Sequence, residues 1–204
     1  MMTDSRFQTR FWRIALPLLV GVAVLFVWQG AVTAFDVPSF VLPAPTLIAE
    51  SLVANFGSLM GSLVVTLRVT VAAFLLASVG GVALAILFVQ NRAVETALFP
   101  YAIILQVTPV VAIAPLILIW VGFDQVELAL LILAWIVAFF PVLSNTVLGL
   151  RSVDHNLTDL FRLYGASRLQ TLIELQLPAA LPYILAGMKI SGGLALIGAV
   201  VAEF

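Results

Sequence analysis

Few side chains in this sequence could carry out chemistry. The chain has no cysteine and a single histidine, His155. It therefore has no side chain for a thiolate metal site and only one for histidine-based catalysis. His155 falls in a polar stretch, where we expect it to be solvated. The single lysine, Lys189, is followed by Ile190, whereas a Walker A phosphate-binding loop needs serine or threonine there. We therefore predict no catalytic residue, no metal and no cofactor, which makes an intramembrane enzyme the least favoured class.

Composition places the chain in a membrane. Of its 204 residues, 63% are hydrophobic and 9% are charged, whereas an ordinary soluble domain carries about a quarter charged residues. A water-soluble fold of this size could not cover its surface with so few charges. The formal net charge of −1 provides no basic surface of the kind that binds nucleic acid, so we exclude nucleic acid as a partner.

Apolar runs of about 20 residues can cross a bilayer, and the sequence contains five. We predict an all-α membrane protein, a polytopic bundle of transmembrane helices. The predicted spans are residues 14–34, 62–89, 99–121, 126–150 and 181–204. The first could be a signal peptide, but it is longer than the usual apolar region of about 7–15 residues, which favours a retained helix. Because the last run ends without polar flanking residues, we expect a sixth helix beyond Phe204.

Arginine placement predicts the orientation, since cytosolic loops carry an excess of Lys and Arg. Seven arginines share one side if the five spans alternate, and the eighth, Arg68, lies at the edge of its span. The seven are Arg6, Arg10, Arg13, Arg92, Arg151, Arg162 and Arg168. We predict a cytosolic N-terminal tail at residues 1–13, a periplasmic loop at 35–61 and a cytosolic segment at 151–180. A short helix at 46–53 either lies on the membrane surface or is a connector.

The 151–180 segment has the pattern of two short amphipathic helices. The first has one apolar stripe at helical spacing, formed by Leu157, Leu160, Phe161 and Tyr164. Asp154 or Asn156 can cap its start. Gly165 can end it, because glycine tolerates the left-handed conformation found at helix ends.

The second helix begins at Ser167, and Gln170 follows at the spacing of a capping box. Its apolar face consists of Leu169, Leu172 and Ile173. Pro178 is predicted to end this helix, and Pro182 suits the first turn of the fifth span. The exposed apolar stripe of such a pair either binds a partner or packs on the chain's own helices or on lipid. Spacing alone supports these alternatives equally.

The segment resembles the characteristic cytosolic loop of ABC-importer permeases. That loop starts with a Glu-Ala-Ala triplet, has a glycine four residues after the last alanine, and closes with Leu-Pro. Gly165 and Leu177-Pro178 match, while the triplet positions hold Asp159, Leu160 and Phe161. Further similarity extends along most of the chain after about residue 40, at residues 42–46, 109, 115–116, 120–122 and 197–204. The branch that the sequence is most similar to handles nitrate, sulfonates and taurine.

The resemblance implies a permease domain at residues 14–204, in a bacterial inner membrane, with its N-terminus cytosolic. It implies that a separate ABC ATPase, which would bind the ATP, docks on the 151–180 segment. The implied contact residues are Asp159, Leu160, Phe161, Gly165, Ala166, Ser167, Leu177 and Pro178. Other implied partners are a periplasmic or lipoprotein substrate-binding protein, a second permease copy and membrane lipid. The implied solute is a nitrate-, sulfonate- or taurine-like anion, or a heterocycle such as a thiamine-pyrimidine precursor or riboflavin.

Inside the spans, few groups could handle a solute. Lys189 either faces the translocation path or extends its ammonium to the cytosolic surface. Pro109 and Pro115 interrupt the third span and are candidates for shaping the path. Small residues recur four apart in the fifth span, a pattern that favours helix packing over a homodimer interface: Gly187, Ser191, Ala195 and Ala199. Because no acidic residue lies mid-span, a secondary transporter or channel is the less favoured alternative.

Overall fold

The computed structural model describes residues 4–203, with side chains from Trp12 onward. The side chains of Arg6 and Arg10, and Phe204 as the end of the fifth predicted span, lie outside the described residues. Every regular element in the described part of the chain is a helix, which confirms the all-α prediction. In order these are α1 (Asp4–Ala34), α2 (Pro45–Ala54), α3 (Phe56–Gln90), α4 (Arg92–Val107), α5 (Val110–Val121), the 3-10 turn η1 (Phe123–Gln125), α6 (Val126–Arg151), α7 (His155–Leu163), α8 (Arg168–Gln170), the π-helical η2 (Thr171–Gln176) and α9 (Leu177–Glu203).

The chain divides into two compact units, Met1–Gly61 and Ser62–Phe204. In the first unit, the helix predicted at residues 46–53 is confirmed as α2. Pro45 occupies its first turn, where the missing N–H costs no hydrogen bond. The Gln29 carbonyl oxygen, Oε1, accepts hydrogen bonds from the backbone N–H and the hydroxyl of Thr46, at 3.2 and 3.3 Å. This side chain therefore joins α1 to the start of α2.

Four helical segments of the described chain are long and apolar enough to cross a membrane: Trp12–Ala34, Phe56–Gln90, Phe123–Arg151 and Arg168–Glu203. They confirm four of the predicted spans, with different bounds. Helix α3 begins at Phe56, so its first turns occupy residues predicted as loop.

The interruption predicted at Pro109 in the third span is confirmed, because α4 and α5 meet at an angle of 105°. The break lies at Thr108 and Pro109. Thr108 has an extended backbone, as expected for a residue that precedes proline, and Pro109 has no N–H to continue the helix. Pro115, also predicted to interrupt the span, lies inside α5. If the two helices of this bent pair together form one span, it is the fifth candidate span.

The predicted helix end at Pro178 is also wrong. The helix is continuous from Arg168 to Glu203, and Pro178 lies in the first turn of α9. A π-helical turn, η2, precedes it, in which Leu177 N–H donates to the Leu172 carbonyl five residues back. Proline in a regular helix clashes with the carbonyl four residues back, and the wider π turn changes that spacing just before Pro178.

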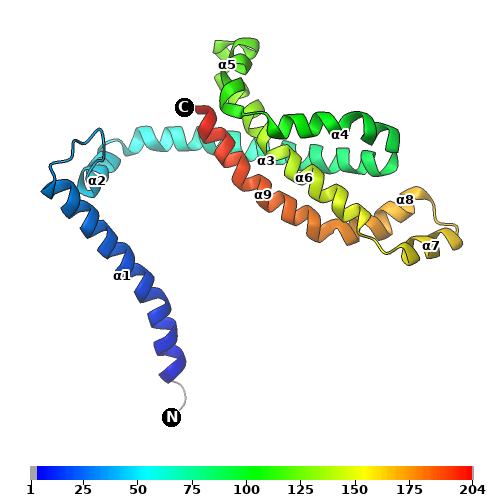
Figure 1. Cartoon of the computed structure of the whole chain (residues 1–204), viewed down its shortest axis with the longest axis horizontal. Coiled ribbons are helices and arrows are strands. Elements are labelled where there is room, and N and C mark those ends of the chain that lie inside the picture. Colours follow the sequence, from blue (N-terminus) through cyan, green and yellow to red (C-terminus); the bar gives the residue numbers. More distant parts are fainter. Residues whose placement is uncertain (1–3, 204) are drawn as a thin grey trace. The chain divides into compact units, whose positions relative to one another are not determined.

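The second unit is organised around α6 and α9, which run side by side (Figure 1). The small residues four apart on α9 face this contact. Ser191, Ala195 and Ala199 are fully buried, and a Cβ at Gly187 would lie 2.9 Å from the Pro141 carbonyl oxygen. Small side chains let two helical backbones approach closely. The interpretation of this pattern as packing is therefore confirmed, and the contact lies within one chain.

Helices α3 and α4 complete the core of the second unit. Gly81 of α3 lies against Val142 and Leu143 of α6. Phe99 of α4 joins the two helices through ring contacts, with centroids 6.1 Å from Phe88 and 6.2 Å from Phe140. The ends of α3 and α6 are thereby held next to the start of α4, where the candidate site lies.

We expect Gly187→Ala to destabilise the fold by about 1–3 kcal/mol, the usual cost of overpacking a filled contact. The new methyl would lie within about 3 Å of Pro141 and Asn145. Gly193→Ala is the matched control, because a Cβ there has no neighbour within 4 Å and alanine is the better helix former. Thermal unfolding in detergent, followed by circular dichroism, should place Gly187→Ala below the parent and Gly193→Ala at or above it. Equal midpoints for the two variants would contradict this packing.

Candidate functional site

The 151–180 segment begins where α6 ends at Arg151, and α7 starts it with a side-chain cap. The Asp154 carboxylate accepts a hydrogen bond from Asn156 N–H at 2.9 Å, satisfying a donor that the helix itself leaves free. Of the two predicted caps, Asp154 is the one used. Figure 1 shows α7 and α8 projecting beyond the ends of α6 and α9.

Gly165 ends α7 as predicted, with φ of +72° in the left-handed region. The chain then turns back through two hydrogen bonds, from Gly165 N–H to the Arg162 carbonyl at 3.0 Å and from Ala166 N–H to the Phe161 carbonyl at 2.9 Å. A side chain with a Cβ is strained in this conformation. The turn between α7 and α8 therefore depends on glycine.

The capping box of the second helix is confirmed. Ser167 N–H donates to the Gln170 carbonyl oxygen, Oε1, at 2.8 Å, and Gln170 N–H donates to the Ser167 hydroxyl at 3.2 Å. Both bonds satisfy backbone donors at the helix start. Helix α7 thus has a defined start and a defined end, and the helix that begins at Arg168 has a defined start and leads back into the membrane-spanning part of the unit.

Most large apolar side chains of this segment are uncovered by the chain itself. Leu163 and Tyr164 are each 85% exposed. The other exposed ones are Leu157, Leu160, Leu169 and Ile173. Phe161 is half-buried and Leu172 is buried, so the predicted stripes are packed only in part on the chain's own helices. Leu163 is absent from the predicted stripe, although the sequence shows that it lies two residues before the turn glycine, Gly165.

The predicted contact residues fall into two groups. Asp159, Leu160 and Phe161 lie on α7, and the Asp159 carboxylate pairs with Arg162 at 3.5 Å, with both side chains exposed. Gly165, Ala166 and Ser167 follow in the turn. The other group is Leu177 and Pro178, which lie in the first turn of α9 rather than in a loop.

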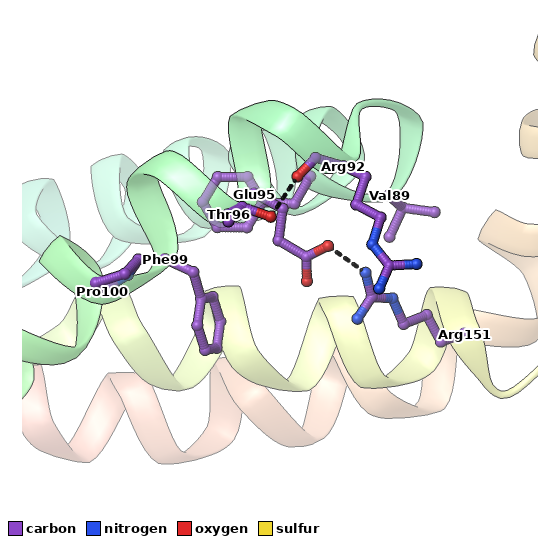
Figure 2. Close-up of a pocket in the computed structure, with 8 residues that line it drawn as sticks. Val89, Arg92, Glu95, Thr96, Phe99, Pro100 and Arg151 are labelled. Carbon is purple, nitrogen blue, oxygen red and sulfur yellow. Dashed lines mark hydrogen bonds and ion pairs between the residues drawn. The ribbon is translucent and has the colours of Figure 1, made fainter.

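An ion pair that nothing in the sequence indicated lies where the 151–180 segment leaves α6. The Arg151 guanidinium donates to the Glu95 carboxylate at 2.6 Å, and these side chains are 51% and 18% exposed. Figure 2 shows the pair at the wall of a cavity that Arg92 also lines. The pair joins the start of α4 to the end of α6, next to the first residue of the segment.

A second cavity lies between the α3–α4 turn and the 151–180 segment, and it is strongly basic. Three arginines line it: Arg92, Arg162 and Arg168. No carboxylate lines it among the described residues. The exposed apolar side chains therefore lie on the same segment as a cluster of positive charge.

The predicted path residues lie on separate elements. Pro109 marks the break between α4 and α5, Pro115 lies in α5, and Lys189 lies on α9 with its side chain exposed. Among residues 4–203, no three His, Asp or Glu side chains are grouped closely enough to hold a metal ion.

Comparison with known proteins gives one family and several relatives. A family model described as "binding-protein-dependent transport system inner membrane component" matches residues 77–204. The riboflavin transport system permease protein of Chloroflexus aurantiacus is 36% identical over 193 residues, which cover 94% of this chain and 71% of the relative. A protein named for aliphatic sulfonates transport in Bacillus subtilis is 36% identical over 189 residues, 91% of this chain and 67% of the relative. A protein of Haemophilus influenzae named as an ABC transporter permease is 32% identical over 192 residues, 94% and 78%.

We expect the Arg151–Glu95 pair to show a coupling free energy of about 0.2–1 kcal/mol, since one partner is half exposed to solvent. A double-mutant cycle of Arg151→Gln and Glu95→Gln, measured by thermal unfolding, gives this value. The matched control is the Arg162–Asp159 pair, whose longer distance and greater exposure predict coupling near zero. Additive effects of the two substitutions at Arg151 and Glu95 would contradict the expected coupling.

Proposed function

This chain belongs to the family of binding-protein-dependent transport system inner membrane components, and we propose that it is the membrane-spanning subunit of an ATP-driven importer that couples to its ATPase through the 151–180 segment. The predicted resemblance to ABC-importer permeases is confirmed by the family match and by the relatives. The observation that carries the proposed coupling role is the pair of capped helices, α7 and α8, that projects apolar side chains into solvent.

The segment has the surface that a protein partner requires. Leu163 and Tyr164 are almost fully exposed, and burying each such side chain stabilises a contact by about 1.5–3 kcal/mol. Arg92, Arg162 and Arg168 line a basic cavity at the same segment. An ATPase surface with an apolar cleft and carboxylates at its rim would complement both features. Of the predicted contact residues, Asp159, Leu160 and Phe161 on α7 supply the docking face, while Gly165, Ala166 and Ser167 fix its angle.

Movement of the docked segment would pass directly into the membrane helices. The helix that begins at Arg168 continues without a break to Glu203, so a shift of α8 carries α9 with it. Leu177 and Pro178 belong to this continuous helix and transmit the movement rather than contact the ATPase. Because α9 is closely packed on α6 along its small residues, the two helices would move as one body.

The orientation follows from the ATPase partner. ATP is available in the cytosol, so the 151–180 segment is cytosolic, as are the N-terminus and the α3–α4 turn, while residues 35–61 are periplasmic. The proposed location is a bacterial inner membrane. A substrate-binding protein would dock on the outer side, and a second copy of this chain, surrounded by lipid, would complete the translocation path. We assign Pro109, Pro115 and Lys189 to that path.

The names of the relatives divide the proposed solutes into two chemical classes. Sulfonates, named for the Bacillus subtilis relative, are anions, whereas riboflavin, named for the Chloroflexus aurantiacus relative, is an uncharged heterocycle at neutral pH. We propose that the solute of this chain is a small molecule from one of these two classes, delivered by the binding protein.

We expect Leu160→Asp to reduce ATP-dependent uptake at least about tenfold, because a carboxylate placed in an apolar contact loses its hydration. Leu160 is exposed, so the substitution should leave the permease folded. His155→Asp is the matched control, at an exposed position in the first turn of the same helix, where an acidic residue is favourable.

The measurement is co-purification of the ATPase subunit and solute uptake into vesicles that hold the complete transporter. Leu160→Asp should lose both, whereas His155→Asp should keep both. If Leu160→Asp binds the ATPase and transports at the parent rate, the 151–180 segment is not the coupling site.

A further inference from the structure

Lys189 lies deep within the membrane-spanning part of the second unit. Its level can be read from neighbouring helices. Gly187 of α9 packs against Val142 of α6, which is nine residues, or about 14 Å, from Arg151 at the end of α6. Lys189 lies two residues farther from that end, about 3 Å more. Its Cα atom is therefore roughly 17 Å from the arginines that mark the cytosolic surface.

Helix α3 gives the same depth independently. Gly81 packs against the same residue, Val142, and lies ten residues, or about 15 Å, from Asn91 at the end of α3. Two neighbouring helices thus agree on the level of this lysine. A hydrocarbon core is about 30 Å thick, so the Cα atom of Lys189 lies near its middle.

The side chain is too short to bring its ammonium to the cytosolic surface. Side chains on a helix lean toward its N-terminus, which for α9 is the cytosolic end, and a lysine stem extends roughly 6 Å. About 10 Å would remain between the ammonium and the level of Arg151. The alternative of an ammonium at the surface is therefore disfavoured, and a charge left in lipid at this depth is costly.

Among the described residues, Lys189 also has no ion-pair partner. It is exposed on the face of α9 opposite the buried residues Gly187 and Ser191, and no carboxylate among the described residues pairs with it. One turn farther along the same face, Gly193 has open space around it. Lys189 therefore lies on an uncrowded face of α9 that the other helices of the second unit leave uncovered.

We propose that Lys189 lines a water-containing translocation path and that its positive charge selects an anionic solute. This inference rests on the proposed function. It assigns the solute to the anions rather than to the uncharged heterocycles. An intramembrane charge is stable where it borders a water-filled cavity, and a positive group in a low-dielectric passage concentrates anions. In the proposed pair of permease copies, two such lysines would border the same path.

Thiol labelling tests the electrostatic effect of the Lys189 charge on nearby reagents. The experiment does not require the solute to be known. The chain has no cysteine, so Gly193→Cys introduces a single thiol one turn from Lys189. In membranes that hold the complete transporter, a sulfonate-bearing thiosulfonate reagent should react about tenfold faster than a trimethylammonium reagent of the same size. Lys189→Met in the same background should remove that preference, while Lys189→Arg should keep it.

Val79 provides a control at matched depth on another helix. Val79 lies on α3 two residues from Gly81, at the same level as Lys189, and is 70% exposed. Val79→Cys should react slowly with both reagents. If Gly193→Cys reacts no faster than Val79→Cys, or shows no preference that depends on Lys189, the inference is overturned.

Uptake measurements distinguish a failure of this inference from a failure of the proposed function. In vesicles with the complete transporter, Lys189→Met should reduce ATP-dependent uptake of ethanesulfonate or nitrate about tenfold, whereas Lys189→Arg should keep uptake near the parent rate. ATP-dependent uptake of riboflavin by the parent, unaffected by Lys189→Met, would overturn the choice of anions but keep the importer. Uptake without any ATP requirement would contradict the importer itself.

Discussion

Close contact between the backbones of α6 and α9 is the constraint on which the second unit depends. Lipid is as apolar as the helices, so helix association in a membrane relies on tight packing rather than on the hydrophobic effect. Gly149 on α6, and Gly187 and Gly198 on α9, each leave too little space for a Cβ without a clash. These contacts extend along most of both helices. They hold α9 at a fixed register against α6, and that register determines where the 151–180 segment leaves and re-enters the bundle.

The same contact gives the segment its mechanical link to the membrane. Gly149 packs on Ala180 and Tyr183, directly beside the two ends of the segment. On one side Arg151 is held by Glu95, and on the other the helix continues unbroken from α8 into α9. The proposed coupling therefore needs no flexible linker. A force applied to α7 and α8 would act on rigid helices packed along their length.

Local signals in the sequence predicted much of the fold and of the candidate site. Hydropathy indicated the spans, and the caps at Asp154 and Ser167 and the turn at Gly165 depend on residues within five positions of each other. Non-local features could not be predicted this way. Glu95 and Arg151 are far apart in the chain, so nothing in their spacing indicates the ion pair.

Proline was the least informative signal. Pro109 breaks a span, whereas Pro115 and Pro178 lie inside helices. The difference lies in the surroundings of each proline. Thr108 is extended before Pro109, while a π-helical turn precedes Pro178 and changes the hydrogen-bond spacing there. A residue type alone does not specify such surroundings, which depend on how the neighbouring turns pack.

The central claim is that this chain moves a solute only when a separate ATPase drives it. The most direct measurement is uptake into sealed vesicles that contain the permease with or without the ATPase and binding protein, with ATP on the side of the 151–180 segment. We expect uptake only in the complete, ATP-supplied vesicles, and none when a proton gradient replaces ATP. Uptake by the permease alone, driven by a proton or solute gradient, would contradict it.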